Sequence, residues 1–196
     1  MTDTGSGQVQ LWRVFPWDPK ARLGEPFSPS YQPATQGTGR FDLPGQSSGV
    51  IYTAEAPEHA IGERIQFFRG QVLDDSDLVV MGKALAISSA MLPQEVRDKL
   101  ADLCDPHLLV RLRTGPDDIA ARARRTTQRV AQAVFASGRS GLRWWSAFFG
   151  EWHTVVLFRE RLTAPLDWSS PEPLSLGDDR LREAAQLLGI VTARSR

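Results

Sequence analysis

Short runs of β-forming residues and longer helical stretches follow one another along this chain, without the strict alternation of a doubly wound parallel sheet. Aromatic and β-branched runs predict strands, and apolar residues at helical spacing predict helices. Strands are expected at residues 10–15, 50–54, 83–90, 108–112 and 153–158. Helices are expected at residues 58–68, 93–103, 116–136 and 178–188. This order predicts an α+β fold in which central mixed or antiparallel sheets are flanked by helices.

The predicted helix at residues 58–68 has one broad apolar face. The apolar residues that share this face are Ala60, Ile61, Ile65, Phe67 and Phe68. Glu63 lies at the edge of the face. A carboxylate is therefore expected at the border of the core.

A long segment, residues 16–48, separates the first two predicted strands and is rich in Pro, Gly, Ser and Thr. It has neither helical nor strand periodicity, so we expect it to run over the surface. Loops of this length in compact domains are usually functional or mobile. Residues of this segment are therefore candidates for binding a ligand.

The length of 196 residues fits one domain of more than average size. Residues 1–8 are small and polar, and we expect them to be disordered. We expect residues 9–162 to form the main domain. Residues 163–196 are predicted to be a proline-rich connection and a C-terminal helix that packs on the same domain.

The charge balance and the cysteine count exclude several classes of protein. The 23 basic and 23 acidic residues give a net charge of zero, which argues against a protein that mainly coats nucleic acid. No apolar window approaches the roughly 18 residues of a membrane span, and the first residues lack the features of a secretory signal. Cys104 is the single cysteine, so an internal disulfide is excluded. We predict a cytoplasmic protein.

The zero net charge conceals a cationic segment. Between Arg111 and Arg143 the chain has eight arginines and two aspartates, a local charge of +6. Arginine binds phosphate oxygens in a bidentate manner, so a minority of these residues could face an anionic ligand or an acidic partner. Most are expected to be ordinary surface groups.

Several common catalytic motifs are absent from the sequence. It has no phosphate-binding glycine loop ending in Lys-Ser or Lys-Thr, no Gly-x-Gly-x-x-Gly, no His-Glu-x-x-His and no Gly-x-Ser-x-Gly. His59, His107 and His153 are too far apart in sequence to suggest a metal site, so no metal is expected. Cys104 has no basic neighbour at useful spacing, and we expect a buried or inert thiol.

Three local patterns remain, and their order along the chain is informative. The first is Gly-Thr-Gly-Arg-Phe-Asp at residues 37–42. The second is Gly-Val-Ile-Tyr-Thr-Ala at residues 49–54, followed by Glu63 on a predicted helix. The third is Ser-Gly-Leu-Arg-Trp-Trp-Ser at residues 140–146, which leads into the predicted strand at residues 153–158. In this order the patterns resemble the RES domain family, named for its arginine, glutamate and serine.

The resemblance runs from Leu11 to Phe158 and implies an ADP-ribosyltransferase-like fold. It also implies a bacterial toxin that destroys NAD and is held inactive by a cognate antitoxin of the Xre or a related helix-turn-helix class. The matched family residues are Arg40, Tyr52, Glu63 and Ser146, with Arg13 at a second frequently basic position. Phe41 and Asp42 stand where the family usually has Trp-Asn, the loop before Tyr52 is longer, and His153 stands where asparagine is common.

The chemistry of NAD cleavage suits these residue types. Breaking the bond between nicotinamide and ribose passes through an oxocarbenium-like state, which a carboxylate such as Glu63 can stabilise. Arg40, presented by glycine-rich backbone, suits a pyrophosphate. Flat rings need aromatic or apolar walls. The residues predicted to bind the substrate are Tyr52, Ser146, Arg13, Trp145 and His153, with Trp144 as an alternative wall.

Each assignment has a structural alternative. Glu63 could be a solvated helix residue, and Arg40 could merely hold a loop by bonding carbonyl groups. Tyr52 could be a plain core tyrosine. Trp144 and Trp145 are adjacent in a predicted β-forming segment, so only one of the two rings can face the core.

The sequence supports three hypotheses about the function. The first is an NAD glycohydrolase or phosphorylase that is the toxin of a toxin–antitoxin pair, with water or phosphate as acceptor. The second is an ADP-ribosyltransferase that modifies a macromolecule. The third is a catalytically inactive relative that binds a partner through residues 111–143 or the C-terminal helix. The sequence leaves open whether the protein forms a homodimer.

Overall fold

The computed structural model describes residues 9–33, 36–45, 49–146 and 148–193. The predicted disordered segment, residues 1–8, lies outside this part of the chain. The chain divides into two compact units. The first unit consists of Met1–Val9, Gln32–Thr53 and Leu92–Pro165, and the second of Gln10–Tyr31, Ala54–Met91 and Leu166–Arg196.

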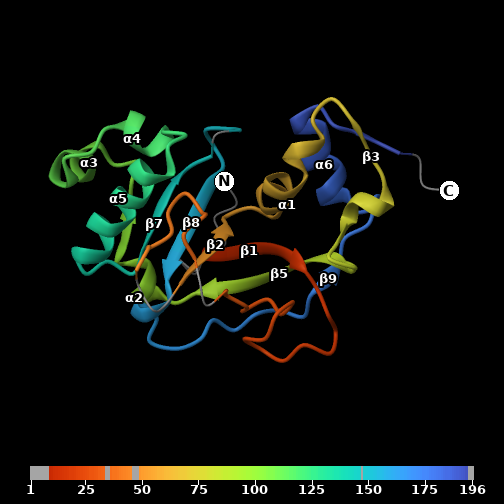
Figure 1. Ribbon diagram of the computed structural model, residues 1–196, viewed down its shortest axis with the longest axis horizontal. Coiled ribbons are helices and arrows are strands. Elements are labelled where there is room, and N and C mark those ends of the chain that lie inside the picture. Colours follow the sequence, from red (N-terminus) through yellow and green to blue (C-terminus); the bar gives the residue numbers. More distant parts are fainter. Residues whose placement is uncertain (1–8, 34–35, 46–48, 147, 194–196) are drawn as a thin grey trace. The chain divides into compact units, whose positions relative to one another are not determined.

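The first unit combines a sheet with short helices (Figure 1). Its strands are β2 (Val50–Ala54), β6 (Leu100–Asp102), β7 (Gly141–Trp145) and β8 (His153–Phe158). Its helices are α2 (Gln94–Arg97), α3 (Pro106–Leu112), α4 (Pro116–Ala120), α5 (Arg124–Ala136) and the 3-10 turn η3 (Arg159–Arg161).

The sheet of the first unit is mixed, with the strand order β2-β8-β7-β6. β7 and β8 run antiparallel, and β6 pairs with β7 in parallel. Strands β7 and β8 approach closely at Gly141. A Cβ atom at this position would lie 2.2 Å from the carbonyl oxygen of Val156 on β8. Only glycine fits this position without displacing the neighbouring backbone.

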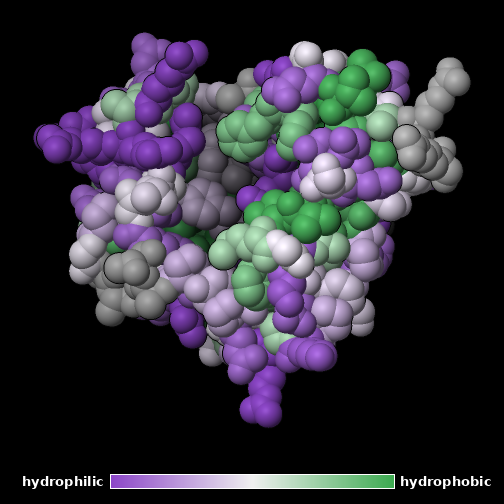
Figure 2. All heavy atoms as spheres, turned by 45° about the vertical axis from the view of Figure 1, so that its right-hand side comes forward, coloured by the Kyte–Doolittle hydropathy of each residue, from purple (hydrophilic) through white to green (hydrophobic). Residues whose placement is uncertain are grey.

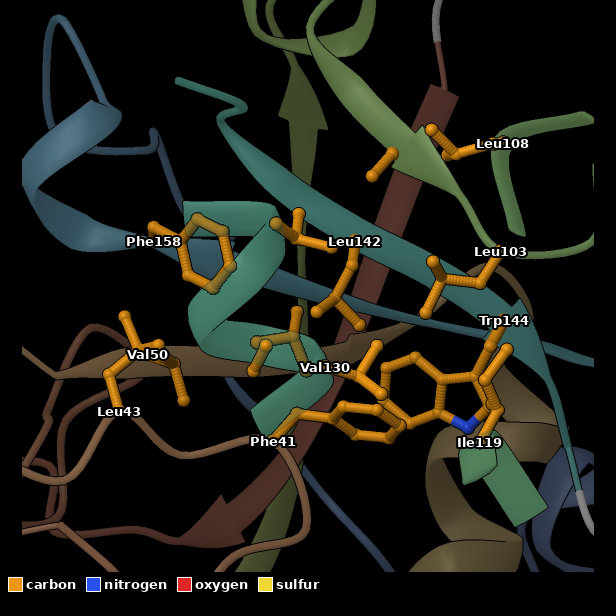
Figure 3. Close-up of a cluster of buried hydrophobic side chains, with 14 of the residues drawn as sticks. Phe41, Leu43, Val50, Leu103, Leu108, Ile119, Val130, Leu142, Trp144 and Phe158 are labelled. Carbon is orange, nitrogen blue, oxygen red and sulfur yellow. The ribbon is translucent and has the colours of Figure 1, made fainter. Parts of the chain in front are cut away.

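The core of the first unit lies between α5 and the sheet, and part of it comes from the segment before β2 (Figure 3). Phe41 is fully buried, and its ring centroid lies 4.2 Å from that of Trp144 on β7. Leu43 is buried in the same cluster. The described residues between 17 and 45 are irregular as predicted, but they contribute to the core as well as to the surface.

The second unit is also built from strands and helices (Figure 1). Its strands are β1 (Val9–Pro16), β3 (Val72–Leu73), β4 (Val79–Val80), β5 (Lys83–Leu92), β9 (Glu172–Pro173) and β10 (Val191–Thr192). Its helices are α1 (Pro57–Ile65), α6 (Asp179–Leu188) and the 3-10 turns η1 (Gln66–Phe68) and η2 (Asp75–Leu78).

The strands of the second unit follow the order β4-β5-β1, β9 pairs antiparallel with β5, and β10 pairs in parallel with β3. α1 packs against α6 (Figure 1). α6 begins after Asp178, whose side chain accepts from the amide of Arg180, and ends at Gly189, which has a φ of 67°. An aspartate N-cap and a left-handed glycine C-cap explain why the predicted bounds of this helix are confirmed.

The predicted α+β class, with mixed sheets and flanking helices, is confirmed, but two local predictions were wrong. Residues 108–112 form part of helix α3 instead of a strand. Asp105 caps this helix through the amide of His107, and Pro106 occupies its first turn, so the pair Asp-Pro starts a helix that continues through this leucine-rich run. The helix predicted at residues 93–103 is the short helix α2 followed by strand β6.

Two further helices are shorter than predicted. The helix expected at residues 116–136 breaks at residues 121–123 into α4 and α5. The carbonyl of Ile119, which a continuous helix would bond to residue 123, accepts instead from Arg40. α1 ends at Ile65, and Phe67 in the following 3-10 turn is 76% exposed, so it does not share the buried face.

No helix among the described residues is long and apolar enough to span a membrane.

We predict that Gly141→Ala lowers the free energy of unfolding by about 2 kcal/mol or more, because the added Cβ meets a strand carbonyl that cannot move independently. Urea unfolding followed by circular dichroism measures the change. Gly150→Ala is the matched control, since a Cβ atom there would have open space. Equal unfolding midpoints for the two variants would contradict the prediction.

Candidate active site

A buried aspartate organises the loop at residues 36–42, before strand β2. Asp42 is 3% exposed. Its Oδ2 accepts hydrogen bonds from the amide of Gly37 at 2.7 Å and from the amide of Gly39 at 2.8 Å. The loop therefore folds back on its own carboxylate.

Helix α5 also holds this loop, through hydrogen bonds from two of its side chains to the loop backbone. Gln128 donates from Nε2 to the carbonyl oxygens of Gly37 and Gly39, at 2.9 Å each. The hydroxyl of Thr127 donates to the carbonyl oxygen of Arg40. Because both the amides and the carbonyls of the loop are bonded, the backbone that carries Arg40 is fixed.

The guanidinium of Arg40 is partly buried and incompletely bonded. Its Nη2 donates to the carbonyl oxygen of Ile119 in α4 at 2.6 Å. Its Nε is buried and has no hydrogen-bond partner among the described residues. An unbonded buried N–H group costs about 1–3 kcal/mol, which an anionic ligand could offset. Arg40 therefore holds the loop through its bond to Ile119, and its Nε is an unbonded donor of the kind that suits an anion.

Tyr52 on β2 belongs to the same group of residues. Its hydroxyl donates to Oδ1 of Asp42 at 2.8 Å and accepts from the amide of Phe41 at 2.9 Å. Burial, and then the negative charge of Asp42, raise the pKa of Tyr52 well above its ordinary value. The phenol is therefore neutral at physiological pH, and its hydroxyl lies inside the protein.

The adjacent tryptophans of β7 alternate in burial, as predicted. Trp144 is buried against Phe41, whereas Trp145 is half-buried. Trp145 pairs with His153 across the strands β7 and β8, and His153 is also half-buried. These two predicted substrate-binding residues are therefore neighbours.

Ser146 directly follows strand β7 and is buried. Its amide donates to the carbonyl oxygen of Trp152 at 2.6 Å, and its Oγ accepts from the amide of Phe148 at 3.1 Å. The serine thus closes the connection between β7 and β8. Its hydroxyl proton has no acceptor among the hydrogen bonds that we observe for the described residues, so it can still donate to a ligand.

Glu63 lies on α1 in the second unit, and the side chain is 44% exposed. Its Oε1 lies 3.3 Å from Nε2 of His59, which is fully buried. Its Oε2 accepts from Nε2 of Gln66 at 3.2 Å. Both carboxylate oxygens are thus held by residues of the same helical segment, while part of the group remains open to solvent.

Arg13 on β1 is half-buried in the second unit. Its Nη1 donates to the carbonyl oxygen of Pro29 at 2.6 Å, and no described carboxylate lies within ion-pair distance of it. Burial, and then the positive charge of Arg64, lower the pKa of Arg13 to about 10. The residue stays charged at neutral pH, and its environment favours an anionic partner.

Most arginines of the cationic segment lie at the surface of the first unit. Figure 2 shows hydrophilic side chains gathered over the surface that α3 and α4 form. Two arginines of this segment form ion pairs: Arg129 with Asp118 at 3.7 Å, and Arg143 with Asp102 at 3.3 Å. The exposed members are Arg111, Arg113, Arg122, Arg124, Arg125 and Arg129.

The described residues contain no group of three or more side chains that could hold a metal ion. Cys104 is partly buried in the turn after β6, not at the end of a helix. Burial, and then the negative charge of Asp102, raise the pKa of Cys104 to about 11. A thiol with this pKa is protonated at neutral pH, which agrees with the expected inert cysteine.

The sequence analysis predicted no role for Asp42 in the loop that carries Arg40, or for His59 beside Glu63. A short acidic side chain three residues after a glycine commonly bonds backbone amides of its own loop, and this signal could have identified Asp42. Residues four apart on a helix share a face, which could have linked His59 to Glu63.

Comparisons with known proteins show the family and a similar fold. The sequence model of the RES domain matches residues 10–177. The fold is similar to that of a chain in the crystal structure of the M. tuberculosis MbcT-MbcA toxin-antitoxin complex, with a TM-score of 0.59 and 16% sequence identity. The match covers 93% of this chain and 90% of that chain. No curated protein sequence matches this chain.

We predict that Cys104 reacts with iodoacetamide at pH 8 roughly a hundredfold more slowly than a free cysteine, because the raised pKa leaves little thiolate. Mass spectrometry of the alkylated protein measures the rate. Asp102→Asn should increase the rate, since it removes a negative charge beside the thiol. Labelling of the folded protein at the rate of the urea-unfolded chain would contradict the prediction.

Proposed function

This chain belongs to the RES domain family, and we propose that it is an NAD-consuming enzyme that serves as the toxin of a bacterial toxin–antitoxin pair. The observation that carries the proposal is the family match over residues 10–177, which contains each of the candidate site residues. The similar fold of a chain from a toxin–antitoxin complex supports it.

Glu63 is the proposed catalytic carboxylate. The bond from the nicotinamide nitrogen to the ribose carbon breaks, nicotinamide leaves with the electron pair, and positive charge develops on the ribose. A carboxylate stabilises that charge or orients the attacking group. The hydrogen bonds from His59 and Gln66 fix the direction of both oxygens, and the 44% exposure of the side chain leaves it accessible to a substrate.

Arg40 and Arg13 are the proposed ligands of the NAD phosphates. Each guanidinium is partly buried and donates to a backbone carbonyl, and we observe no ion pair for either among the described residues. Arginine is the side chain best suited to hold a pyrophosphate, because its planar fork matches two oxygens. The unbonded Nε of Arg40 supplies one donor for this purpose.

The flat rings and the ribose of NAD are assigned to half-buried side chains. Tyr52, Trp145 and His153 provide aromatic surfaces. The hydroxyl proton of Ser146 is assigned to a phosphate or ribose oxygen, since its Oγ accepts from the amide of Phe148. A binding role suits this serine better than a nucleophilic one, because nucleophilic serines need an adjacent general base.

The acceptor defines the reaction class. Water gives a glycohydrolase that releases ADP-ribose, and phosphate gives a phosphorylase that releases phosphorylated ADP-ribose. Transfer to a macromolecule is the second candidate function. The third is binding to a partner without catalysis, for which the exposed arginines between residues 111 and 129 offer a surface.

We predict that the purified protein releases nicotinamide from NAD, and that Glu63→Gln lowers kcat by about 100-fold or more. Chromatography of the products with and without phosphate identifies the acceptor, and labelled NAD reveals transfer to protein or nucleic acid. Glu183→Gln on α6 is the matched control and should retain full activity. No turnover by the unmodified protein, or full turnover by Glu63→Gln, would contradict the proposal.

We also predict that expression of the unmodified protein in bacteria lowers cellular NAD and stops growth, and that Glu63→Gln does neither at equal protein level. The proposed partner is an antitoxin of the helix-turn-helix class, and its co-expression should restore growth. Cytoplasmic NAD is the proposed target. Normal growth and normal NAD with the unmodified protein would contradict the toxin role.

A further inference from the structure

We infer that Asp42 is the positioning residue of the loop that carries Arg40, and that it fixes Tyr52 as a hydrogen-bond donor to the protein instead of to the substrate. The inference rests on the proposed function for its kinetic consequences only. Its structural part, the bond from Tyr52 to Asp42, stands without it.

The carboxylate of Asp42 joins the loop at residues 36–42 to strand β2. Its Oδ2 takes the amides of Gly37 and Gly39, and its Oδ1 takes the hydroxyl of Tyr52. All three distances lie between 2.7 and 2.8 Å. A carboxylate accepts hydrogen bonds and donates none, so Asp42 bonds three donors that an apolar residue at this position would leave without this partner.

The direction of the hydrogen bond of Tyr52 follows from its two partners. The amide of Phe41 can only donate, so the phenol oxygen accepts there. The single phenol proton then goes to Asp42. Tyr52 has no second proton to offer, and its contribution to a ligand is the aromatic ring.

The packing around Gly39 supports this role. A Cβ atom at position 39 would lie 2.4 Å from Oδ1 of Asp42 and 2.5 Å from the hydroxyl oxygen of Tyr52. The absence of a side chain at Gly39 therefore makes room for the bond between the aspartate and the tyrosine. Gly39 thus leaves room for the bond between Asp42 and Tyr52, in addition to allowing a ligand to approach the loop.

Arg40 belongs to the loop that the carboxylate of Asp42 holds. The amide of Gly39 and the side chain of Asp42 bracket it in sequence, and Thr127 holds its carbonyl oxygen. Loss of the aspartate would free the amides of the loop and loosen the position of the guanidinium. We therefore expect the effect of Asp42 on NAD to appear in KM more than in kcat.

The chain has two tyrosines, Tyr31 and Tyr52, which gives a direct spectroscopic test. In the Tyr31→Phe protein, phenolate absorbance reports on Tyr52 alone. We expect no ionisation of Tyr52 up to about pH 11, because burial and the charge of Asp42 both disfavour the phenolate. Circular dichroism at each pH shows that the protein is folded.

The variant Asp42→Asn keeps the shape of the side chain and removes its charge. In the Tyr31→Phe background we expect it to lower the pKa of Tyr52, because it removes the negative charge that disfavours the phenolate. Asp117→Asn, at an exposed position on α4, is the matched control and should leave the titration unchanged. Ionisation of Tyr52 near pH 10 in the Tyr31→Phe protein would overturn the inference even if Asp42→Asn fails to fold.

The kinetic test uses Asp42→Asn, Tyr52→Phe and the double variant. We expect Asp42→Asn to raise KM for NAD by about tenfold and Tyr52→Phe to raise it by less, because the tyrosine variant leaves the bonds of Asp42 to Gly37 and Gly39 in place. The double variant should be no worse than Asp42→Asn, because the bond between Asp42 and Tyr52 can be lost only once. Additive effects, or an unchanged KM, would overturn the positioning role. If the unmodified protein does not cleave NAD, the proposed function fails, while the titration still decides the bond between Asp42 and Tyr52.

Discussion

The ring of Phe41 lies against the indole of Trp144, buried between the sheet and α5, and anchors a long irregular segment to the core (Figure 3). Large aromatic rings bury much apolar area, and their removal from a core typically costs about 3–5 kcal/mol. The residues on either side of the anchor are Arg40 and Asp42. The position of both polar groups therefore depends on this apolar contact together with the hydrogen bonds of the loop.

Four partly buried arginines show two arrangements. Arg143 and Arg180 form ion pairs with neighbouring carboxylates. Arg13 and Arg40, by contrast, are partly buried and donate to backbone carbonyls, and we observe no ion pair for them among the described residues. A buried charge without a counter-ion lowers stability, so its retention suits a place where an anion binds.

Local chemistry explains which parts of the fold could be predicted. Helix α6 has an aspartate cap, an apolar face and a terminal glycine, and strand β8 is a continuous β-forming run, so both follow from short stretches of sequence. The break between α4 and α5 could not be predicted, because the carbonyl of Ile119 bonds Arg40, which is 79 residues away. The order of motifs identified the candidate residues, but it did not predict their hydrogen-bond partners.

The sequence by itself determined the α+β class, the family and the residue types available for binding an anionic dinucleotide, since periodicity, capping residues and motif order are local properties of the chain. The tertiary structure decided what those residues bond to. It brought the carbonyl oxygen of Ile119 to Arg40, and it placed Thr127 and Gln128 of α5 against the loop that carries Arg40. The physical reason is that a buried hydrogen bond depends on distance and direction in space, which folding alone fixes for groups that are far apart in sequence.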